Sequence, residues 1–128
     1  MALPNAYAQY NNSKVLTATP SELTLMLYEG AIKFCNIALI AMEQKDVQKA
    51  HTNIVKTQKI VEYLRQTLDM NYPVAKDFED IYVYLEKRLV QANMKKDHEI
   101  LDECLGHLRE IRDTWKEVMR MNREKGNI

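Results

Sequence analysis

The stretch TPSELTLMLYEGAIKFCNIALIAME, residues 19–43, decides the fold of this chain. It opens with a helix start signal, because Thr19 offers a capping oxygen, Pro20 suits the first helical turn and Glu22 stands in capping-box position. Its apolar residues recur three and four positions apart, the spacing of side chains that share a helix face. We therefore expect a helix from about Pro20 to about Glu43.

This first helix carries two apolar seams. One seam is Leu23, Leu27, Gly30, Phe34, Ile37 and Ala41, and the other is Leu25, Tyr28, Ile32, Cys35, Leu39 and Met42. The polar arc, which contains Glu22, Glu29, Lys33 and Asn36, is only about 100° wide. Two explanations stay open: the helix is the central, most buried element of the fold, or part of its surface is a groove for a partner.

Three further helices follow, joined by short connections. Asp46 can cap a second helix that we expect to extend to about Met70. A third is expected over about Ala75–Lys95. Asp97 can cap a fourth that runs to about Arg123. Because short links make consecutive helices antiparallel neighbours, the four helices should lie side by side.

Each of these three helices has one apolar seam at alternating three- and four-residue spacing, as in supercoiled bundles. The seams are Val47, Ala50, Ile54, Thr57, Val61, Leu64 and Leu68; then Phe78, Ile81, Tyr82, Leu85, Leu89 and Ala92; then Leu101, Cys104, Leu108, Ile111, Trp115, Val118 and Asn122. The expected fold class is all-α: an antiparallel up-and-down four-helix bundle over residues 19–125, preceded by an N-terminal cap segment, residues 1–18.

Charge and composition exclude several classes of protein. Eighteen basic and eighteen acidic residues give no general attraction to nucleic acid or to an anionic membrane. Cys35 and Cys104 lie in apolar helical patterns, not at redox or zinc spacing, which favours the reducing cytoplasm. No signal-peptide pattern and no run of about eighteen apolar residues occurs, so we expect neither targeting outward nor membrane insertion.

The histidines do not form a recognisable metal or catalytic motif. None of His51, His98 and His107 is preceded three positions earlier by glutamate, as di-iron bundles require. Cys104 and His107 share a helix face, but zinc needs three or four protein ligands. Since there is also no glycine-rich phosphate loop or nucleophile elbow, we expect a non-enzyme without a metal or cofactor.

The first eighteen residues are polar but contain aromatic anchors, Tyr7 and Tyr10. Such a segment is too polar for a core helix, yet it can lie across an apolar groove and be displaced from it. The alternative is that the two tyrosines simply complete the core of the bundle.

Several stretches together resemble the FliS-type flagellar secretion chaperones. NAYAQY, residues 5–10, is similar to the family's paired-tyrosine opening, although Ala6 stands where proline is usual. TATPSELTLMLYEG, residues 17–30, resembles the signature first helix. RLVQAN at 88–93 and LREIRDTW at 108–115 look like the third- and fourth-helix motifs, in the same order.

The resemblance implies a cytoplasmic chaperone that binds the disordered C-terminal segment of flagellin, prevents premature polymerisation and presents flagellin to the flagellar type III export gate. It also implies that the N-terminal segment covers part of the apolar surface until flagellin replaces it. The partner-binding residues expected are Tyr7, Tyr10, Leu25, Tyr28, Ile32, Leu39 and Met42. The sequence leaves open which seam faces inward and whether the chain is a monomer or a swapped dimer.

A histidine phosphotransfer bundle is the alternative function from another class. Four-helix domains with an exposed histidine relay phosphate, and His51 is followed by Lys56 on the same expected helix. The glycine usual near such a histidine is missing.

Overall fold

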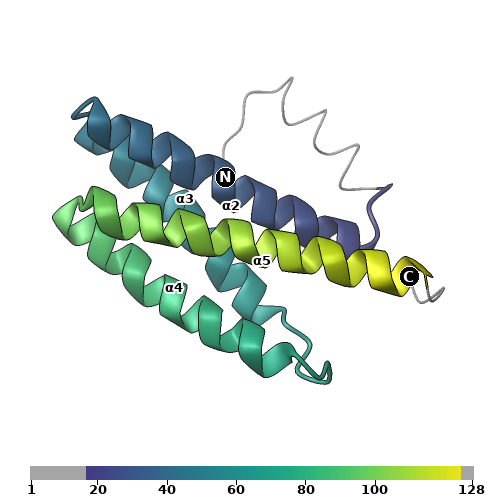
Figure 1. The fold of residues 1–128 in the computed structure, drawn as a ribbon. Coiled ribbons are helices and arrows are strands. Elements are labelled where there is room, and N and C mark those ends of the chain that lie inside the picture. The colour runs from purple at the N-terminus through teal and green to yellow at the C-terminus, as the bar shows by residue number, and fades with distance from the viewer. Residues whose placement is uncertain (1–16, 125–128) are drawn as a thin grey trace.

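The computed structural model describes residues 17–124, and these form an antiparallel four-helix bundle (Figure 1). Its helices are α2 (Pro20–Glu43), α3 (Val47–Gln66), α4 (Ala75–Lys95) and α5 (His98–Glu124). Helix α2 packs against α3 and α5, and α4 packs against the same two helices. Helices α2 and α4 are therefore diagonal to each other, and the expected all-α bundle is confirmed.

Side-chain caps begin three of the four helices, as the sequence predicts. Thr19 Oγ1 accepts a hydrogen bond from the backbone N–H three residues ahead at 3.1 Å. Asp46 Oδ1 does the same at 3.1 Å, and Asp97 Oδ1 at 3.2 Å. Each bond satisfies one of the backbone donors that a helix leaves without an internal partner.

The α2–α3 and α4–α5 connections lie at the same end of the bundle and share one turn geometry. Lys45 and Lys96 have φ angles of 60° and 50°, the left-handed conformation that commonly ends a helix. The next residue, Asp46 or Asp97, donates its N–H to the carbonyl five residues back, at 2.8 and 3.0 Å respectively. The same aspartate then caps the following helix, so a Lys-Asp pair reverses the chain in both places.

Helix α3 ends at Gln66, four residues before the predicted end near Met70. The Asp69 carboxylate accepts a hydrogen bond from the N–H of Asn71 at 2.9 Å, which closes a turn that competes with helix formation. The predicted end of this helix was wrong because the spacing of apolar residues contains no information about such a local side-chain hydrogen bond.

The core contains an aromatic cluster that links α2, α4 and α5. The hydroxyls of Tyr28 on α2 and Tyr82 on α4 share a buried hydrogen bond across the diagonal. Trp115 on α5 lies edge-on to Tyr28 and to Phe78, with ring centroids 6.5 and 6.2 Å apart. The Trp115 indole also donates to the Ser21 carbonyl at 3.0 Å, which ties α5 to the first turn of α2.

Helix α2 is long and apolar enough to cross a membrane by length and composition alone. In the bundle, however, Ala31, Cys35, Ala38 and Ala41 are completely buried. Small side chains on this helix let α3 and α5 pack closely on both sides of it. This burial places one side of α2 in the core, where the helix packs against two neighbours as α4 does, and both explanations of its double seam stay open.

Candidate partner-binding surface

Two of the predicted partner-binding residues, Tyr28 and Leu39, lie in the core. They are 1% and 5% exposed. Burial raises the pKa of the Tyr28 hydroxyl far above its usual range, so this group stays neutral and bonded to Tyr82. A partner can contact these two side chains only if the helices separate, and their proposed role in binding stays a prediction.

Three other predicted residues, Leu25, Ile32 and Met42, are partly exposed. Leu25 and Ile32 lie three and four positions from Tyr28, whose ring faces Trp115 of α5. They therefore border α5 along one margin of α2. The remaining predicted residues, Tyr7 and Tyr10, lie outside the described part of the chain.

A further set of α2 residues forms a third seam, which we call the α2 stripe: Met26, Gly30, Lys33, Ile37 and Ile40. Ile40 is 49% exposed, and Met26, Gly30 and Ile37 are partly exposed. The sequence analysis missed this seam because Gly30 and Ile37 were assigned to the first of the two apolar seams and Lys33 to the polar arc. The spacing of four, three, four and three residues was the signal that could have identified it.

The α2 stripe runs along the edge between α2 and α3. A Cβ atom placed on Gly30 would lie 3.5 Å from Ile60 Cδ1, so α3 approaches the helix closely at this point. Because glycine has no side chain, Ile60 of α3 can pack close to the backbone of α2 here. The stripe thus combines partly exposed apolar side chains with a close helix contact at Gly30.

Basic groups lie beside this stripe. The ammonium of Lys56 is 5.1 Å from the centre of the Phe34 ring, and that of Lys33 is 6.0 Å from it. Both distances are within reach of cation–π attraction. Phe34 itself is buried, so the two lysines cover its ring at the α2–α3 edge. A partner that lies on the stripe would meet apolar side chains toward both ends and the positive charge of Lys33 between them, with that of Lys56 close by.

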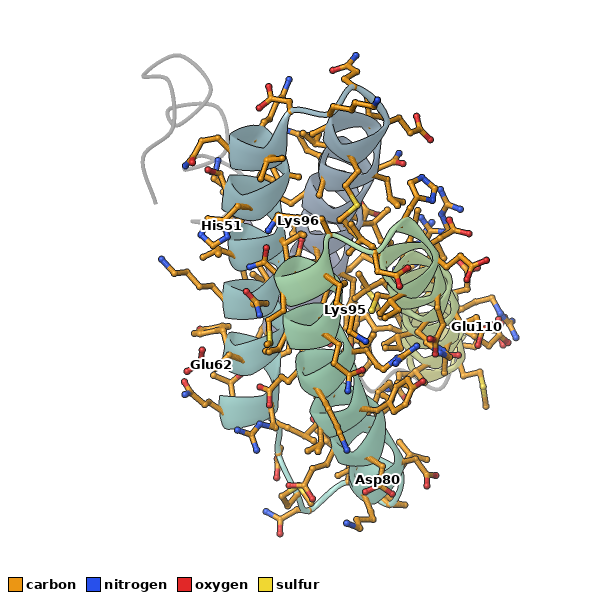
Figure 2. The ribbon with its side chains drawn as sticks, turned by 90° about the vertical axis from the view of Figure 1, so that its left-hand side faces the viewer. His51, Glu62, Asp80, Lys95, Lys96 and Glu110 are labelled. Atoms are coloured by element: carbon orange, nitrogen blue, oxygen red, sulfur yellow. The ribbon has the colours of Figure 1, made fainter. Side chains whose placement is uncertain are left out.

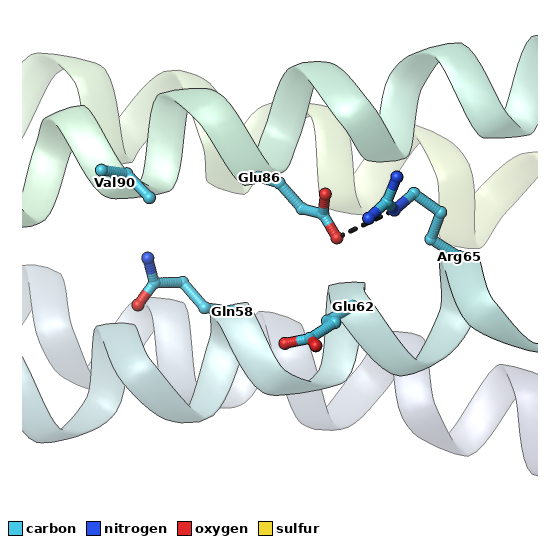
Figure 3. Close-up of a pocket in the computed structure, with 5 residues that line it drawn as sticks. All are labelled: Gln58, Glu62, Arg65, Glu86 and Val90. Atoms are coloured by element: carbon cyan, nitrogen blue, oxygen red, sulfur yellow. Dashed lines mark hydrogen bonds and ion pairs between the residues drawn. The ribbon is translucent and has the colours of Figure 1, made fainter.

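A hollow between α3 and α4 is a poorer candidate (Figure 3). It is lined by Gln58, Glu62, Arg65, Glu86 and Val90 and encloses about 210 Å³. Arg65 Nε donates to Glu86 Oε1 at 3.2 Å across it. Sites for small molecules are usually larger, about 300–1,000 Å³, and mostly apolar. This hollow is smaller than that, and four of its five lining residues are charged or polar.

The described part of the chain offers little for catalysis. No group of three or more His, Cys, Asp or Glu side chains within residues 17–124 is placed to hold a metal ion. Burial raises the pKa of the Cys35 and Cys104 thiols to about 12, so neither is a ready nucleophile. The His51 ring nitrogen Nδ1 lies 3.0 Å from the Asn93 amide nitrogen. These groups therefore act in packing and local hydrogen bonding.

A polar network joins α4 to α5 on the surface. Tyr84 and His107 donate to one oxygen of the Glu103 carboxylate, and Arg88 donates to the other. Hydrogen bonds from Tyr84 and Arg88 lower the pKa of Glu103 to about 2. The network fixes one helix against its neighbour and needs no ligand to explain it.

The fold defines the class of the described chain: an all-α, antiparallel four-helix bundle whose helix α2 keeps a partly exposed apolar edge. The family model described as flagellar protein FliS matches residues 3–122. The flagellar secretion chaperone FliS of Bacillus subtilis is 40% identical over 97% of this chain and 93% of its own length. Those of Salmonella typhimurium and Escherichia coli are 32% and 31% identical over 88% and 89% of this chain, each across 87% of its own length. The chain belongs to the FliS family of flagellar secretion chaperones.

Family membership confirms the resemblance inferred from the sequence motifs and places the chain among proteins of flagellar assembly and export. It also favours the chaperone over the histidine phosphotransfer alternative. The matched region begins at residue 3 and therefore includes the paired-tyrosine opening, although the described residues begin at Thr17.

Proposed function

We propose that this chain binds the C-terminal segment of flagellin in the cytoplasm, keeps it from polymerising and delivers it to the flagellar type III export apparatus. Family membership supports this role. The observation that supports it is the surface of α2: after packing against α3 and α5, this helix still exposes Ile40 and part of Met26 and Ile37 along one edge. Apolar side chains that follow one edge of a helix in this way offer a contact surface for an apolar partner segment.

The physical reasoning follows from the state of the partner. A disordered segment loses conformational entropy when it becomes ordered, so it needs a broad apolar surface to offset that cost. An amphipathic helix laid on the α2 stripe would bury its own apolar face and the three exposed aliphatic side chains together. Binding of this kind is reversible and needs no nucleotide hydrolysis, as release at an export apparatus requires.

The direct test is calorimetric titration with flagellin and with flagellin that lacks its C-terminal segment. We expect the chain to bind intact flagellin and not to bind flagellin that lacks its C-terminal segment. Ile40→Glu should weaken binding by roughly tenfold or more, because it places a charge in the apolar contact. Val90→Glu, at a similarly exposed position on the diagonal helix α4, is the matched control and should leave affinity unchanged. Equal losses in the two variants would refute the α2 stripe as the site.

The N-terminal segment, residues 1–18, is part of the same proposal. We propose that it covers the apolar surface of α2 through Tyr7 and Tyr10 until flagellin replaces it. Removal of residues 1–16 should then leave the bundle folded and raise flagellin affinity, since no internal competitor remains. The single tryptophan, Trp115, bonds to the carbonyl of Ser21 and offers a fluorescence signal at the first turn of α2. Unchanged affinity after truncation would remove the self-capping role.

A further inference from the structure

The edge between α2 and α3 is locally basic, although the whole chain has no formal net charge. Lys56 lies over the ring of Phe34 at 5.1 Å, so residues 30–40 of α2 run alongside residues 49–60 of α3. These two stretches contain no aspartate or glutamate, and they contain Lys33, Lys49, Lys56 and Lys59. A local excess of positive charge attracts acidic partners, so this edge has an electrostatic preference that the net charge conceals.

The nearest acidic residues of α2, α3 and their connection lie at the borders of this basic surface. They are Glu29 and Glu62 toward one end, and Glu43 and Asp46 toward the other. Figure 2 shows Glu62 nearer than His51 to the α3–α4 connection. Glu29 is four positions before Lys33 and reduces its charge. The positions three and four residues from Lys56 are Thr52, Asn53, Lys59 and Ile60, so the middle of the edge stays basic.

Apolar side chains lie on both sides of this charge along the α2 stripe. Met26 is partly exposed on one side of Lys33. On the other side Ile37 is partly exposed and Ile40 is 49% exposed. A partner helix laid along the stripe would therefore match it with apolar residues toward both ends and acidic residues near its middle.

We propose that the segment bound at the α2 stripe is an acidic amphipathic helix whose carboxylates lie between its apolar anchors and face Lys33 and Lys56. This inference rests on the partner-binding role proposed for the stripe. Apolar contact provides affinity for any amphipathic helix, whereas a basic helix with the same apolar pattern would meet like charge at the lysines. Lys33 and Lys56 are therefore specificity-determining residues.

The N-terminal segment lacks the charge that such a partner supplies. Residues 1–16 contain no aspartate or glutamate, and their one charged side chain is that of Lys14. A cap formed by Tyr7 and Tyr10 would compete for apolar contact but would offer the lysines no carboxylate side chain. An acidic partner therefore has an electrostatic advantage when it replaces the cap, and salt reduces that advantage.

The side chains between the lysines favour a polypeptide over a nucleic acid. Proteins that bind single strands combine basic groups with aromatic rings on which bases stack. Here the ring of Phe34 is only 8% exposed and lies beneath the lysines. The exposed groups are the aliphatic side chains of Ile37 and Ile40, which suit the apolar face of a helix.

Two synthetic peptides test the charge preference without relying on flagellin. Both are helices of about 18 residues, long enough to span the α2 stripe, with the same leucines and with either glutamate or lysine at every charged position. In fluorescence anisotropy at low salt, the full chain should bind the acidic peptide roughly tenfold more tightly than the basic one. Added salt should reduce this preference. Equal affinity for the two peptides would overturn the proposal, as would tighter binding of a single-stranded oligonucleotide than of the acidic peptide.

Charge reversal shows where the preference arises. The Lys33→Glu/Lys56→Glu variant should prefer the basic peptide, because its new carboxylates repel the acidic one. The matched control is Lys87→Glu/Lys95→Glu, which changes the net charge equally on the diagonal helix α4 and should still prefer the acidic peptide. Circular dichroism establishes that both variants are folded. An unchanged preference in the first variant, or an equal change in the control, would refute the role of the two lysines.

Flagellin itself separates this inference from the proposed function. Lys33→Gln/Lys56→Gln removes both charges, keeps most of each side chain and should weaken flagellin binding by roughly three- to tenfold. If flagellin binds this variant and the wild type equally tightly, flagellin is a partner but the charge pairing is wrong. If flagellin does not bind the wild type while the acidic peptide does, the proposed function fails and the charge preference stands.

Discussion

Replacement of Tyr82 by phenylalanine tests the polar centre of the bundle. Tyr28 and Tyr82 are 1% and 2% exposed, and their hydroxyls bond to each other. Tyr82→Phe keeps the ring but leaves the Tyr28 hydroxyl buried without its partner. A buried donor or acceptor without a partner costs about 1–3 kcal/mol. For a domain of this size each kcal/mol lowers the melting temperature by roughly 3–6 °C.

The double variant Tyr28→Phe/Tyr82→Phe gives the opposite expectation. It removes both polar groups at once, so no hydroxyl is left buried and unbonded, and its stability should approach that of the wild type. The double variant is therefore expected to be more stable than either single variant. Such a coupling is measured by a double-mutant cycle.

Urea unfolding followed by far-ultraviolet circular dichroism is the suitable assay. Trp115 lies 6.5 Å from the Tyr28 ring, so its fluorescence would report changes in local environment as well as unfolding. If the double variant lost as much free energy of unfolding as the two single variants lose together, the two hydroxyls would not act as a pair. The reasoning would then be refuted. Flagellin affinity of the double variant should equal that of the wild type, because Tyr28 is buried; a loss would restore Tyr28 as a contact residue.

Three further outcomes follow from single groups. Because hydrogen bonds lower the pKa of Glu103 to about 2 from its usual 4.5, their contribution to stability is present above pH 4.5 and is lost as the pH falls toward 2. Urea unfolding should therefore show that Glu103→Gln is less stable than the wild type at neutral pH. The difference in free energy of unfolding should shrink as the pH falls from 4.5 toward 2, and a constant difference would contradict this reasoning. Burial raises the pKa of Cys35 and Cys104 to about 12, so iodoacetamide should label neither thiol at neutral pH until the chain is unfolded, as mass spectrometry would show. A Cβ on Gly106 would meet nothing within 4 Å, so Gly106→Ala should raise the free energy of unfolding by up to about 1 kcal/mol, and a decrease would indicate strain in α5.

The helices and their order could be predicted from the sequence because the deciding interactions are local. The caps of Thr19, Asp46 and Asp97 each involve a backbone N–H only three residues away. Periodicity then identified most of the buried residues of α3, α4 and α5, although Val47, predicted in the seam of α3, is 61% exposed. The end of α3 was missed because the apolar seam continues to Leu68, two residues past the end of the helix at Gln66, and the turn closed by Asp69 and Asn71 follows.

The orientation of α2 was decided only by the tertiary structure. Its apolar residues occupy three sides, and a helical wheel gives their relative angles without saying which side a neighbour covers. The close approach of α3 at Gly30 and the contact of Trp115 with Tyr28 turn Tyr28 and Leu39 inward and leave Ile40 outside. Sequence alone determined that α2 has more apolar surface than one neighbour can bury. Packing against two neighbours determined which part of that surface stays open to a partner.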